Sequence, residues 1–327
     1  MTSLDGSTIL VTGGTGSFGR KFTEIVLKTA APRKLIIFSR DEMKQHEMRK
    51  DYPDTSDSPM RYFIGDVRDL DRLRRAMQGV DVVVHAAALK QVPSCEYNPF
   101  EAVKTNVVGA QNVIEAAIDA GVKRVLAIST DKAVSPVNIY GATKLCAEKL
   151  FVHGNSYSRE GGARFACCRY GNVVSSRGSV VPAFFEQQRN GCITLTDPRM
   201  TRFWLTLQQG VEFVIRCLGV LQGGEVFIPK IPSMRITDLA RAIAPHTPVK
   251  IVGIRPGEKI HESLLSEDEA RDAVELDNMY VIVWRDRPWA GPDFPGGRPL
   301  PAGFRYTSDT NSAWLSVGDL RALVVDA

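Results

Sequence analysis

The chain has 327 residues, of which 44% are hydrophobic and 24% charged, and its formal net charge is +4. That length allows one large domain or two smaller ones around a substantial core. The net positive charge is small and the basic residues form no run, so we expect no nucleic acid partner. No apolar stretch approaches the ~20 residues of a membrane span, so we expect no membrane partner either.

The first half of the chain alternates short apolar runs with longer amphipathic ones. The short runs predict strands at Thr8–Thr12, Lys34–Phe38, Arg61–Ile64, Val82–His85, Arg124–Ser129 and Arg164–Arg169. The longer runs predict helices near Ser17–Thr29, Asp41–Lys50, Asp69–Met77, Pro99–Ala120 and Tyr140–Arg159. Strands separated by helices form right-handed βαβ units, so the sequence predicts an α/β fold with a doubly wound, parallel Rossmann sheet.

The pattern changes after Arg169, where glycine and proline become frequent and the helices shorten. A helix at Leu207–Leu218 and a strand at Glu225–Ile228 are expected to return to the sheet. The stretch Trp289–Gly303 is rich in proline and glycine and predicts an irregular surface segment. We therefore expect a Rossmann domain of residues 1–172 and 205–228, and a smaller, discontinuous α/β substrate domain of residues 173–204 and 229–327.

A glycine-rich turn lies directly between the first predicted strand and the first predicted helix. Gly14, Gly16 and Gly19 fit the pattern G-x-G-x-x-G, and Gly13, Gly16 and Gly19 fit G-x-x-G-x-x-G. Glycines allow positive φ and let the backbone approach a pyrophosphate, whose charge the helix N-terminus stabilises. In this strand–turn–helix context the pattern predicts a dinucleotide-binding site.

The second predicted strand ends at Phe38 and is followed by Ser39 and Arg40. NAD sites place an acid here to bind the ribose 2′-hydroxyl, whereas a hydroxyl and a guanidinium suit a 2′-phosphate, so the sequence predicts NADP. Asp41, the next residue, is suited to cap the following helix. Asp66, after the third strand, is expected either to contact the adenine or to belong to a helix-capping loop.

Tyr140 and Lys144 form the pattern Tyr-x-x-x-Lys on a predicted helix, where positions i and i+4 share one face. A lysine ammonium beside the phenol favours the phenolate and lowers the tyrosine pKa toward the range of acid–base chemistry. Downstream of a glycine-rich turn, this pattern is similar to that of short-chain dehydrogenases.

Thr130, Asp131 and Lys132 follow the fifth predicted strand, at the edge of the sheet where such folds bind their ligands. In extended short-chain dehydrogenases that only epimerise, the sequence at this position usually looks like Ser-Ser-Ser or Ser-Ser-Thr. Those that dehydrate sugars usually have the pair Asp-Glu after the threonine. An acid can protonate a departing hydroxyl, and a lysine poised as the free amine can remove a carbon-bound proton that a neighbouring ketone has acidified. The Asp-Lys pair therefore predicts a dehydration.

With these motifs the chain resembles the inverting UDP-N-acetylglucosamine 4,6-dehydratases of the pseudaminic acid pathway over almost its whole length. Besides Thr130–Ala133, the resemblance rests on Phe38–Glu42, Ala86–Pro93, Arg169–Val173, Arg177–Val180, Asp197–Phe203 and Arg255–Lys259. It implies an extended short-chain dehydrogenase that binds NADP and UDP-N-acetylglucosamine and associates into homo-oligomers, either dimers or hexamers.

The resemblance and the motifs together imply three sets of site residues. The catalytic set is Thr130, Asp131, Lys132, Tyr140 and Lys144. The cofactor set is Gly13, Thr15, Gly16, Ser17, Phe18, Gly19, Ser39, Arg40, Asp66, Val67, Ala86, Ala87, Ala88, Lys90, Tyr140 and Lys144. The substrate set is Lys90, Asn172, Arg177, Val180, Thr194, Met200, Arg202, Arg255 and Glu258, whose arginines are suited to phosphate oxygens.

The implied reaction begins when Tyr140, assisted by Lys144, takes the proton of the sugar C4 hydroxyl while hydride leaves C4 for the cofactor. The ketone acidifies C5–H, which Lys132 removes while Asp131 helps to expel the C6 hydroxyl as water. Hydride then returns to C6, and either Lys132 or Tyr140 reprotonates C5 on the face that inverts it.

Other functions stay open: a related UDP-sugar dehydratase or epimerase of capsule or O-antigen synthesis, and a non-catalytic NADP-binding sensor. The intact acid–base residues disfavour the sensor. A simple 4-epimerase would need no acid and base beside C5 and C6.

The six cysteines have neither C-x-x-C spacing nor nearby histidines. We therefore expect no metal site and no disulfide framework, but reduced thiols in the cytoplasm. The first polar residues lead directly to a predicted strand, so we expect no signal peptide.

Overall fold

A computed structural model describes residues 4–174, 180–284 and 294–325, and it has the α/β fold that the sequence predicts. Parallel strands form the centre of one large sheet: β1 (Thr8–Thr12), β2 (Lys34–Ser39), β3 (Met60–Ile64), β4 (Val82–His85), β5 (Arg124–Ile128), β6 (Arg164–Cys168) and β10 (Val226–Pro229). Their order, β10-β6-β5-β4-β1-β2-β3, reverses direction between β1 and β4. In such sheets ligands bind outside the carboxyl ends of the strands at this reversal.

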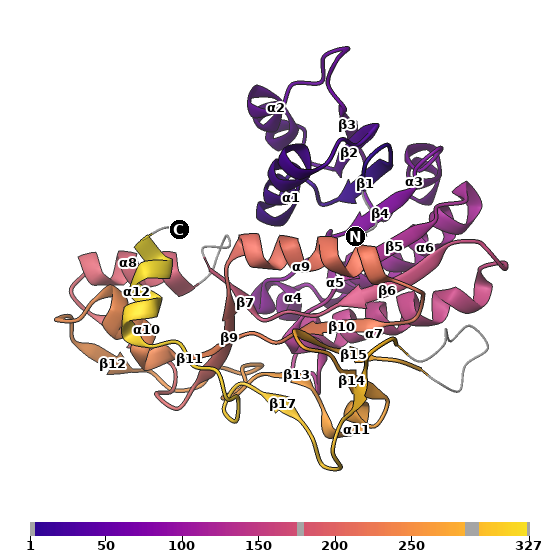
Figure 1. Ribbon diagram of the computed structural model, residues 1–327. Helices are drawn as coiled ribbons and strands as arrows, with labels where there is room; N and C mark the ends of the chain where they lie inside the picture. The colour runs from indigo at the N-terminus through magenta and orange to yellow at the C-terminus, as the bar shows by residue number, and fades with distance from the viewer. Residues whose placement is uncertain (1–3, 175–179, 285–293, 326–327) are drawn as a thin grey trace.

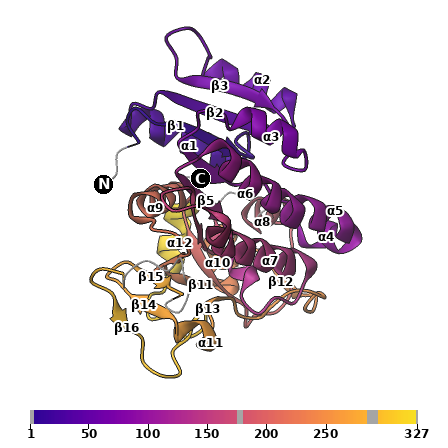
Figure 2. The ribbon, with the colours of Figure 1, turned by 90° about the vertical axis from the view of Figure 1, so that its right-hand side faces the viewer.

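Helices cover both faces of this sheet (Figures 1 and 2). On one face α1 (Ser17–Thr29) packs against α9 (Leu207–Val220). On the other, α3 (Leu70–Ala76), α6 (Gly109–Ala120) and α7 (Ile139–Gly154) pack in that order. Because both faces are covered, the central strands are continuous apolar runs such as Ile9, Leu10 and Val11 of β1. Among the described residues, no helix has the length and apolar character needed to cross a membrane.

The predicted helix at Pro99–Ala120 is divided in the structure. It consists of α5 (Pro99–Val103), a π-helical turn (Lys104–Val108) and α6, and a further short helix, α4 (Val92–Tyr97), precedes it. The Asn106 side chain in the π turn donates to the Leu89 carbonyl (2.9 Å) and to Thr143 Oγ1 (3.0 Å), and accepts from the Leu89 amide (2.8 Å). Turns of this kind often occur at functional sites. Here the turn fixes the loop after β4 against α7.

A second, smaller core lies at one end of the molecule, at the left of Figure 1. Phe184, Trp204 and Leu239 are among its buried residues. Its elements are α8 (Val180–Arg189), β8 (Ile193–Leu195), β9 (Thr201–Leu205), β11 (Ser233–Arg235), α10 (Ile236–Ile243), β12 (Val249–Ile251) and α12 (Val317–Val325).

The C-terminal region, which the sequence assigns to the substrate domain from residue 229 onward, also adds strands to the main sheet. The strands β14 (Ala273–Glu275), β15 (Met279–Ile282) and β16 (Arg298–Pro299) extend the main sheet with antiparallel pairing beyond β10. They cover the edge of β10, which would otherwise present unpaired backbone groups. The strands β13 (Ser263–Leu265) and β17 (Tyr306–Thr307) pair with each other and add apolar residues to the main core. Of the predicted irregular segment Trp289–Gly303, residues 289–293 lie outside the described residues, and the rest contains β16 and the buried Phe294.

An ion cluster around the buried Arg169, directly after β6, connects helix α7 to the C-terminal region. The Arg169 guanidinium is completely buried and donates to Glu148 of α7 (2.9 Å from Nε) and to Glu269 (2.6 Å from Nη2) of α11 (Glu267–Ala270). Burial raises the pKa of Glu269, but the hydrogen bonds and charge of Arg169 lower it more, so the net pKa lies below the ordinary value. The cluster thereby holds α7 against α11.

Arg169→Met is expected to lower the free energy of unfolding by about 3–5 kcal/mol, because it leaves the buried carboxylate of Glu148 and the partly buried carboxylate of Glu269 without their counter-ion. Urea unfolding at neutral pH measures this loss. The difference from the wild type should shrink as the pH falls, since protonation of Glu269, whose pKa Arg169 lowers, removes the charge that Arg169 stabilises. Arg74→Met, which removes an exposed partner of Asp119, is the control and should leave the unfolding free energy nearly unchanged. Similar losses in both variants would contradict the role given to the cluster.

Candidate active site

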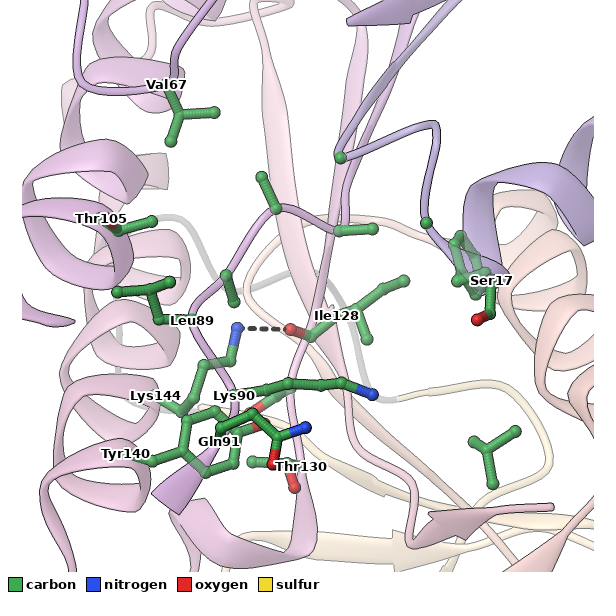
Figure 3. Close-up of a pocket in the computed structure, with 18 of the residues that line it drawn as sticks. Ser17, Val67, Leu89, Lys90, Gln91, Thr105, Ile128, Thr130, Tyr140 and Lys144 are labelled. Atoms are coloured by element: carbon green, nitrogen blue, oxygen red, sulfur yellow. Dashed lines mark hydrogen bonds between the residues drawn. The ribbon is translucent and has the colours of Figure 1, made fainter. Parts of the chain in front are cut away.

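A cavity of about 720 Å³ opens at the carboxyl ends of the strands, where the strand order reverses. Figure 3 shows its centre: Tyr140 and Lys144 enter from α7, Lys90 extends from the loop after β4, and Thr130 lies next to Tyr140. All residues of the predicted catalytic set line this cavity, and so do all residues of the cofactor set except Gly19. The fold therefore brings the two predicted sets together in one place.

The turn between β1 and α1 fits a pyrophosphate. Gly13 has a φ of +65°, and a Cβ on it would lie 2.9 Å from the Cα of Ala87. Gly16 caps α1 without a side-chain hydrogen bond, so no capping side chain engages the amides of the first helical turn. Such free amides and the helix dipole stabilise an anion at this position.

Gly19, which the sequence assigns to the cofactor set, does not line the cavity. A Cβ on Gly19 would overlap the carbonyl oxygen of Gly14. The absence of a side chain thus lets α1 pack closely on the turn and positions its amides, and a contact of Gly19 with a cofactor stays a prediction.

The end of the cavity beyond β2 carries hydroxyl and cationic groups. Ser39 Oγ lies 2.9 Å from Thr15 Oγ1, and the exposed Arg40 lines the same end together with Lys44, which the sequence analysis did not identify. Asp41 caps helix α2 (Glu42–Asp51) as predicted: its side chain accepts from the Lys44 amide (3.0 Å) and contacts Lys44 Nζ (2.6 Å). Because the helix engages this carboxylate, the remaining hydroxyls and cations suit a phosphate ester.

Asp66 has features of both alternatives that the sequence left open. It lines the cavity, and its Oδ1 also accepts from the backbone amide of Arg68 (3.0 Å). Burial raises the pKa of Asp66, but hydrogen bonds from Arg68 lower it below the ordinary value. An ionised carboxylate is therefore fixed in the cavity wall, and its contact with an adenine stays a prediction.

The phenol of Tyr140 is protonated near neutral pH in this structure. Burial raises the pKa of Tyr140 to about 12, against the lowering effect of the Lys132 ammonium and of a hydrogen bond with Thr130. The sequence predicts instead that Lys144 lowers this pKa. The buried Lys144 donates from Nζ to the Ile128 carbonyl (2.7 Å; Figure 3). The cation that acts on the phenol is Lys132.

The turn after β5 holds the predicted acid and base. Thr130 donates from Oγ1 to Asp131 Oδ1 (2.9 Å) at the start of a 3-10 turn (Asp131–Ala133). Lys132 Nζ lies 3.0 Å from Asp131 Oδ1 and 3.3 Å from Oε1 of Glu262. Asp131 and Glu262 are buried, and their second carboxylate oxygens have no hydrogen-bond partner among the described residues.

Lys132 differs from the expected free amine. Burial lowers its pKa, but the carboxylates of Asp131 and Glu262 raise it more, so the net pKa lies above the ordinary value of lysine. The side chain therefore carries a proton near neutral pH and must give it up before it can act as a base.

Gly141 brings α7 into backbone contact with this turn. A Cβ on Gly141 would overlap the carbonyl oxygen of Lys132 and lie 3.0 Å from the Pro136 side chain. The glycine therefore allows the helix that carries Tyr140 to approach the turn that carries Asp131.

Most of the predicted substrate set lies away from the cavity. Asn172 and Lys90 line it. By contrast, Thr194 hydrogen-bonds to Gln187 (2.9 Å), Met200 is buried, and Val180 packs against the second core. Their contact with a substrate stays a prediction.

The predicted arginines are placed in three different ways. Arg202 donates from its guanidinium to the carbonyls of Ile260 (2.9 Å) and Lys259 (3.0 Å), so it holds the segment that leads to Glu262. Arg255 lies at the surface, where its amide donates to the carboxylate of Glu258 (3.2 Å). Arg177 lies outside the described residues.

Residues 9–283 match the family model described as polysaccharide biosynthesis protein. The chain is 50% identical to a protein of Campylobacter jejuni subsp. jejuni serotype O:2 that is named UDP-N-acetylglucosamine 4,6-dehydratase (inverting), over 97% of this chain and 96% of that one. It is 39% identical to a protein of Rickettsia akari that is named UDP-glucose 4-epimerase, over 97% and 95% of the two chains.

Solved structures show the same fold. The structure of Pen from Bacillus thuringiensis is similar over 99% of both chains, with a TM-score of 0.88 and 38% identity. A dTDP-glucose 4,6-dehydratase from Streptomyces venezuelae, solved with NAD bound, is similar over 77% of this chain and 86% of that one, with a TM-score of 0.66 and 23% identity.

Proposed function

The chain belongs to the polysaccharide biosynthesis protein family, and within it we propose that it is a UDP-N-acetylglucosamine 4,6-dehydratase that inverts C5 of the sugar. The observation that carries this function is that Asp131 and Lys132 line the same cavity as Tyr140. A phenol serves the C4 hydroxyl, and an acid and a base beside it serve C6 and C5. Relatives with this name are 50% and 49% identical to the chain. The product, a 4-keto, 6-deoxy sugar, would enter pseudaminic acid synthesis.

The enzyme uses a nicotinamide cofactor, and the form that we propose is NADP. The turn Gly13–Gly19 would hold the pyrophosphate, and Ser39, Arg40 and Lys44 would hold the 2′-phosphate. When bound, the cofactor would supply the hydride chemistry, the removal of hydride from C4 and its return to C6, which no side chain can supply.

Arg40→Ala is expected to weaken NADP binding by about tenfold or more and to leave NAD binding nearly unchanged, because the exposed guanidinium lines the end of the cavity where the 2′-phosphate, which only NADP carries, would lie. Titration calorimetry with each dinucleotide measures the two affinities. Arg49→Ala is the matched control, because Arg49 lies on α2, which follows β2, but does not line the cavity. An equal loss for both dinucleotides would argue against the 2′-phosphate site.

Tyr140 first releases its own phenol proton to solvent, and the resulting phenolate takes the proton of the C4 hydroxyl in the first step. Thr130 bonds to the phenol and to Asp131, and thus connects this proton site to the acid–base pair. The ketone formed at C4 then acidifies the hydrogen on C5.

Lys132 and Asp131 carry out the elimination with one shared proton. Lys132 Nζ first passes its proton to Asp131 Oδ1, 3.0 Å away, which yields a neutral amine and a carboxylic acid. The amine removes the C5 proton, and the acid protonates the C6 hydroxyl as its C–O bond breaks, so that water leaves. This step returns the pair to ammonium and carboxylate.

A UDP-glucose 4-epimerase is the second candidate, because relatives with this name are 39% identical to the chain. Epimerisation changes C4 alone and needs no acid or base at C5 and C6. The Asp131–Lys132 pair would then have no chemical task, and for this reason dehydration is the better proposal.

Incubation of the purified protein with UDP-N-acetylglucosamine and NADP in deuterated water, followed by proton NMR, tests the function. We expect a 4-keto, 6-methyl sugar with deuterium at C5 and the coupling constants of an L-arabino ring. A product with the original C5 configuration would overturn the inversion, a C4 epimer would support the second candidate, and unchanged substrate would overturn the proposal.

The same proposal includes a homo-oligomer in the cytoplasm. Tyr97 of α4 and Phe100 of α5 are 88% and 79% exposed, and apolar side chains gathered in this way favour contact with another chain. The six cysteines are free thiols, which fits a reducing compartment. Sedimentation equilibrium measures the state of assembly.

A further inference from the structure

Glu262 lies beside the acid–base pair, although it comes from a distant part of the chain. Asp131 and Lys132 follow β5 of the main sheet, whereas Glu262 precedes β13 in the C-terminal region. We propose that Glu262 is a positioning residue that holds the Lys132 head group opposite Asp131 and strengthens Lys132 as the base at C5. This inference rests on the dehydration proposed above.

The structure fixes Glu262 firmly. It is 3% exposed, its Oε1 lies 3.3 Å from Lys132 Nζ, and its amide donates to Ser308 Oγ (2.9 Å). The segment before it is anchored by the bonds from Arg202 and by Asn138, whose side chain donates to the Gly257 carbonyl (2.8 Å). The main chain at Glu262 is therefore held in place independently of Lys132.

The charged and titratable groups around Lys132 come from four parts of the fold. Asp131 belongs to its own turn, Tyr140 to α7, Arg202 to β9, and Glu262 and Lys259 to the C-terminal region. Arg202 Nε and Lys259 Nζ each lie 3.9 Å from a Glu262 oxygen, farther than Lys132 Nζ. Lys259 Nζ donates to a backbone carbonyl at 2.6 Å instead. The closest cationic partner of Glu262 is thus Lys132.

The two carboxylates have different tasks because they differ in access. Asp131 lines the cavity and can reach a substrate hydroxyl, whereas Glu262 does not line it. When Asp131 holds the proton for the C6 hydroxyl, it is neutral and cannot stabilise an ammonium. Glu262 then supplies the negative charge that stabilises Lys132 as it takes the C5 proton. Since a carbon acid beside a ketone needs a strong base, this charge speeds the elimination.

Glu262→Gln is the direct test, because it keeps the shape and removes the charge. We expect kcat to fall by about tenfold or more with KM nearly unchanged. Loss of the Glu262 carboxylate lowers the pKa of Lys132, so Asp131 and Lys132 lose their shared proton at lower pH. The basic limb of the profile of kcat against pH should therefore move down by about one pH unit. Glu262→Asp keeps the charge and should restore most of this shift. Glu267→Gln, an exposed carboxylate on α11, is the matched control.

A second measurement needs no turnover. Competitive labelling of lysines across a pH series, read by mass spectrometry, gives the pH at the midpoint of the titration of the Lys132 amine. We expect this midpoint to lie above that of exposed lysines in the wild type and to fall in Glu262→Gln but not in Glu267→Gln. If the wild type does not convert UDP-N-acetylglucosamine, the proposed function fails, but the labelling still tests the effect of Glu262 on Lys132.

Three results would overturn the role of Glu262. One is an unchanged labelling midpoint in Glu262→Gln. Another is a lower kcat with an unmoved basic limb, which is the signature of a purely structural role. The third applies even if Glu262→Gln does not fold: a wild-type midpoint for Lys132 at or below that of exposed lysines.

Discussion

Lys132→Met is expected to stop the reaction after oxidation at C4 and to slow product formation by about 10²–10⁴-fold. Methionine keeps a flexible apolar stem but removes the amine that Asp131 and Glu262 hold at 3.0 and 3.3 Å. The C5 hydrogen then has no base, whereas Tyr140 still serves the C4 hydroxyl. Borodeuteride trapping with mass spectrometry should detect the 4-keto sugar, and NMR in deuterated water should detect no deuterium at C5.

Lys123→Met is the matched control for this variant. Lys123 precedes β5, whereas Lys132 follows it, and its exposed side chain pairs with Asp81 (3.4 Å). The control should exchange C5 and form product as the wild type does. Deuterium uptake at C5 at the wild-type rate in Lys132→Met would exclude Lys132 as the base.

Tyr140→Phe is expected to stop the reaction one step earlier, with a loss of about 10²–10⁴-fold and no 4-keto sugar to trap. The phenylalanine keeps the ring in place and removes only the hydroxyl that takes the C4 proton and bonds to Thr130. Elimination cannot begin, because C5–H is acidic only beside a ketone. The same borodeuteride assay therefore separates the two variants.

Tyr157→Phe serves as the control for the loss of a phenol, because Tyr157 is 79% exposed. The double variant of Tyr140 and Lys132 should behave like Tyr140→Phe, since the earlier block hides the later one. Trapped 4-keto sugar in Tyr140→Phe would assign the C4 proton to another group.

The fold of the first half follows from local pattern. Each strand from β1 to β6 is a short apolar run between amphipathic helices, and the periodicity predicts both. The strands β14–β16 escape prediction because they are short and join the sheet by antiparallel pairing: β15 pairs with β10 across a long stretch of chain, and β14 and β16 add on beyond β15. The π turn around Asn106 escapes for a related reason: its bonds to Leu89 and Thr143 form only in the packed structure.

The candidate site divides in the same way. Gly13, Asp131 and Tyr140, which belong to recognisable motifs, line the cavity. Glu262 lies far from Asp131 in the sequence, and no motif spacing relates the two residues. The protonation of Lys132 was also unpredictable from the sequence, because it depends on a second carboxylate whose position only the tertiary structure fixes.

Gly141 sets the spacing of the active site through a contact between two stretches of main chain. Even the methyl group of alanine would overlap the Lys132 carbonyl, so the helix and the turn would have to move apart. Such a change would leave Tyr140, Asp131 and Lys132 all present while misplacing them relative to one another. In a library of random variants, an inactive clone can therefore carry every reactive group and a single added carbon atom.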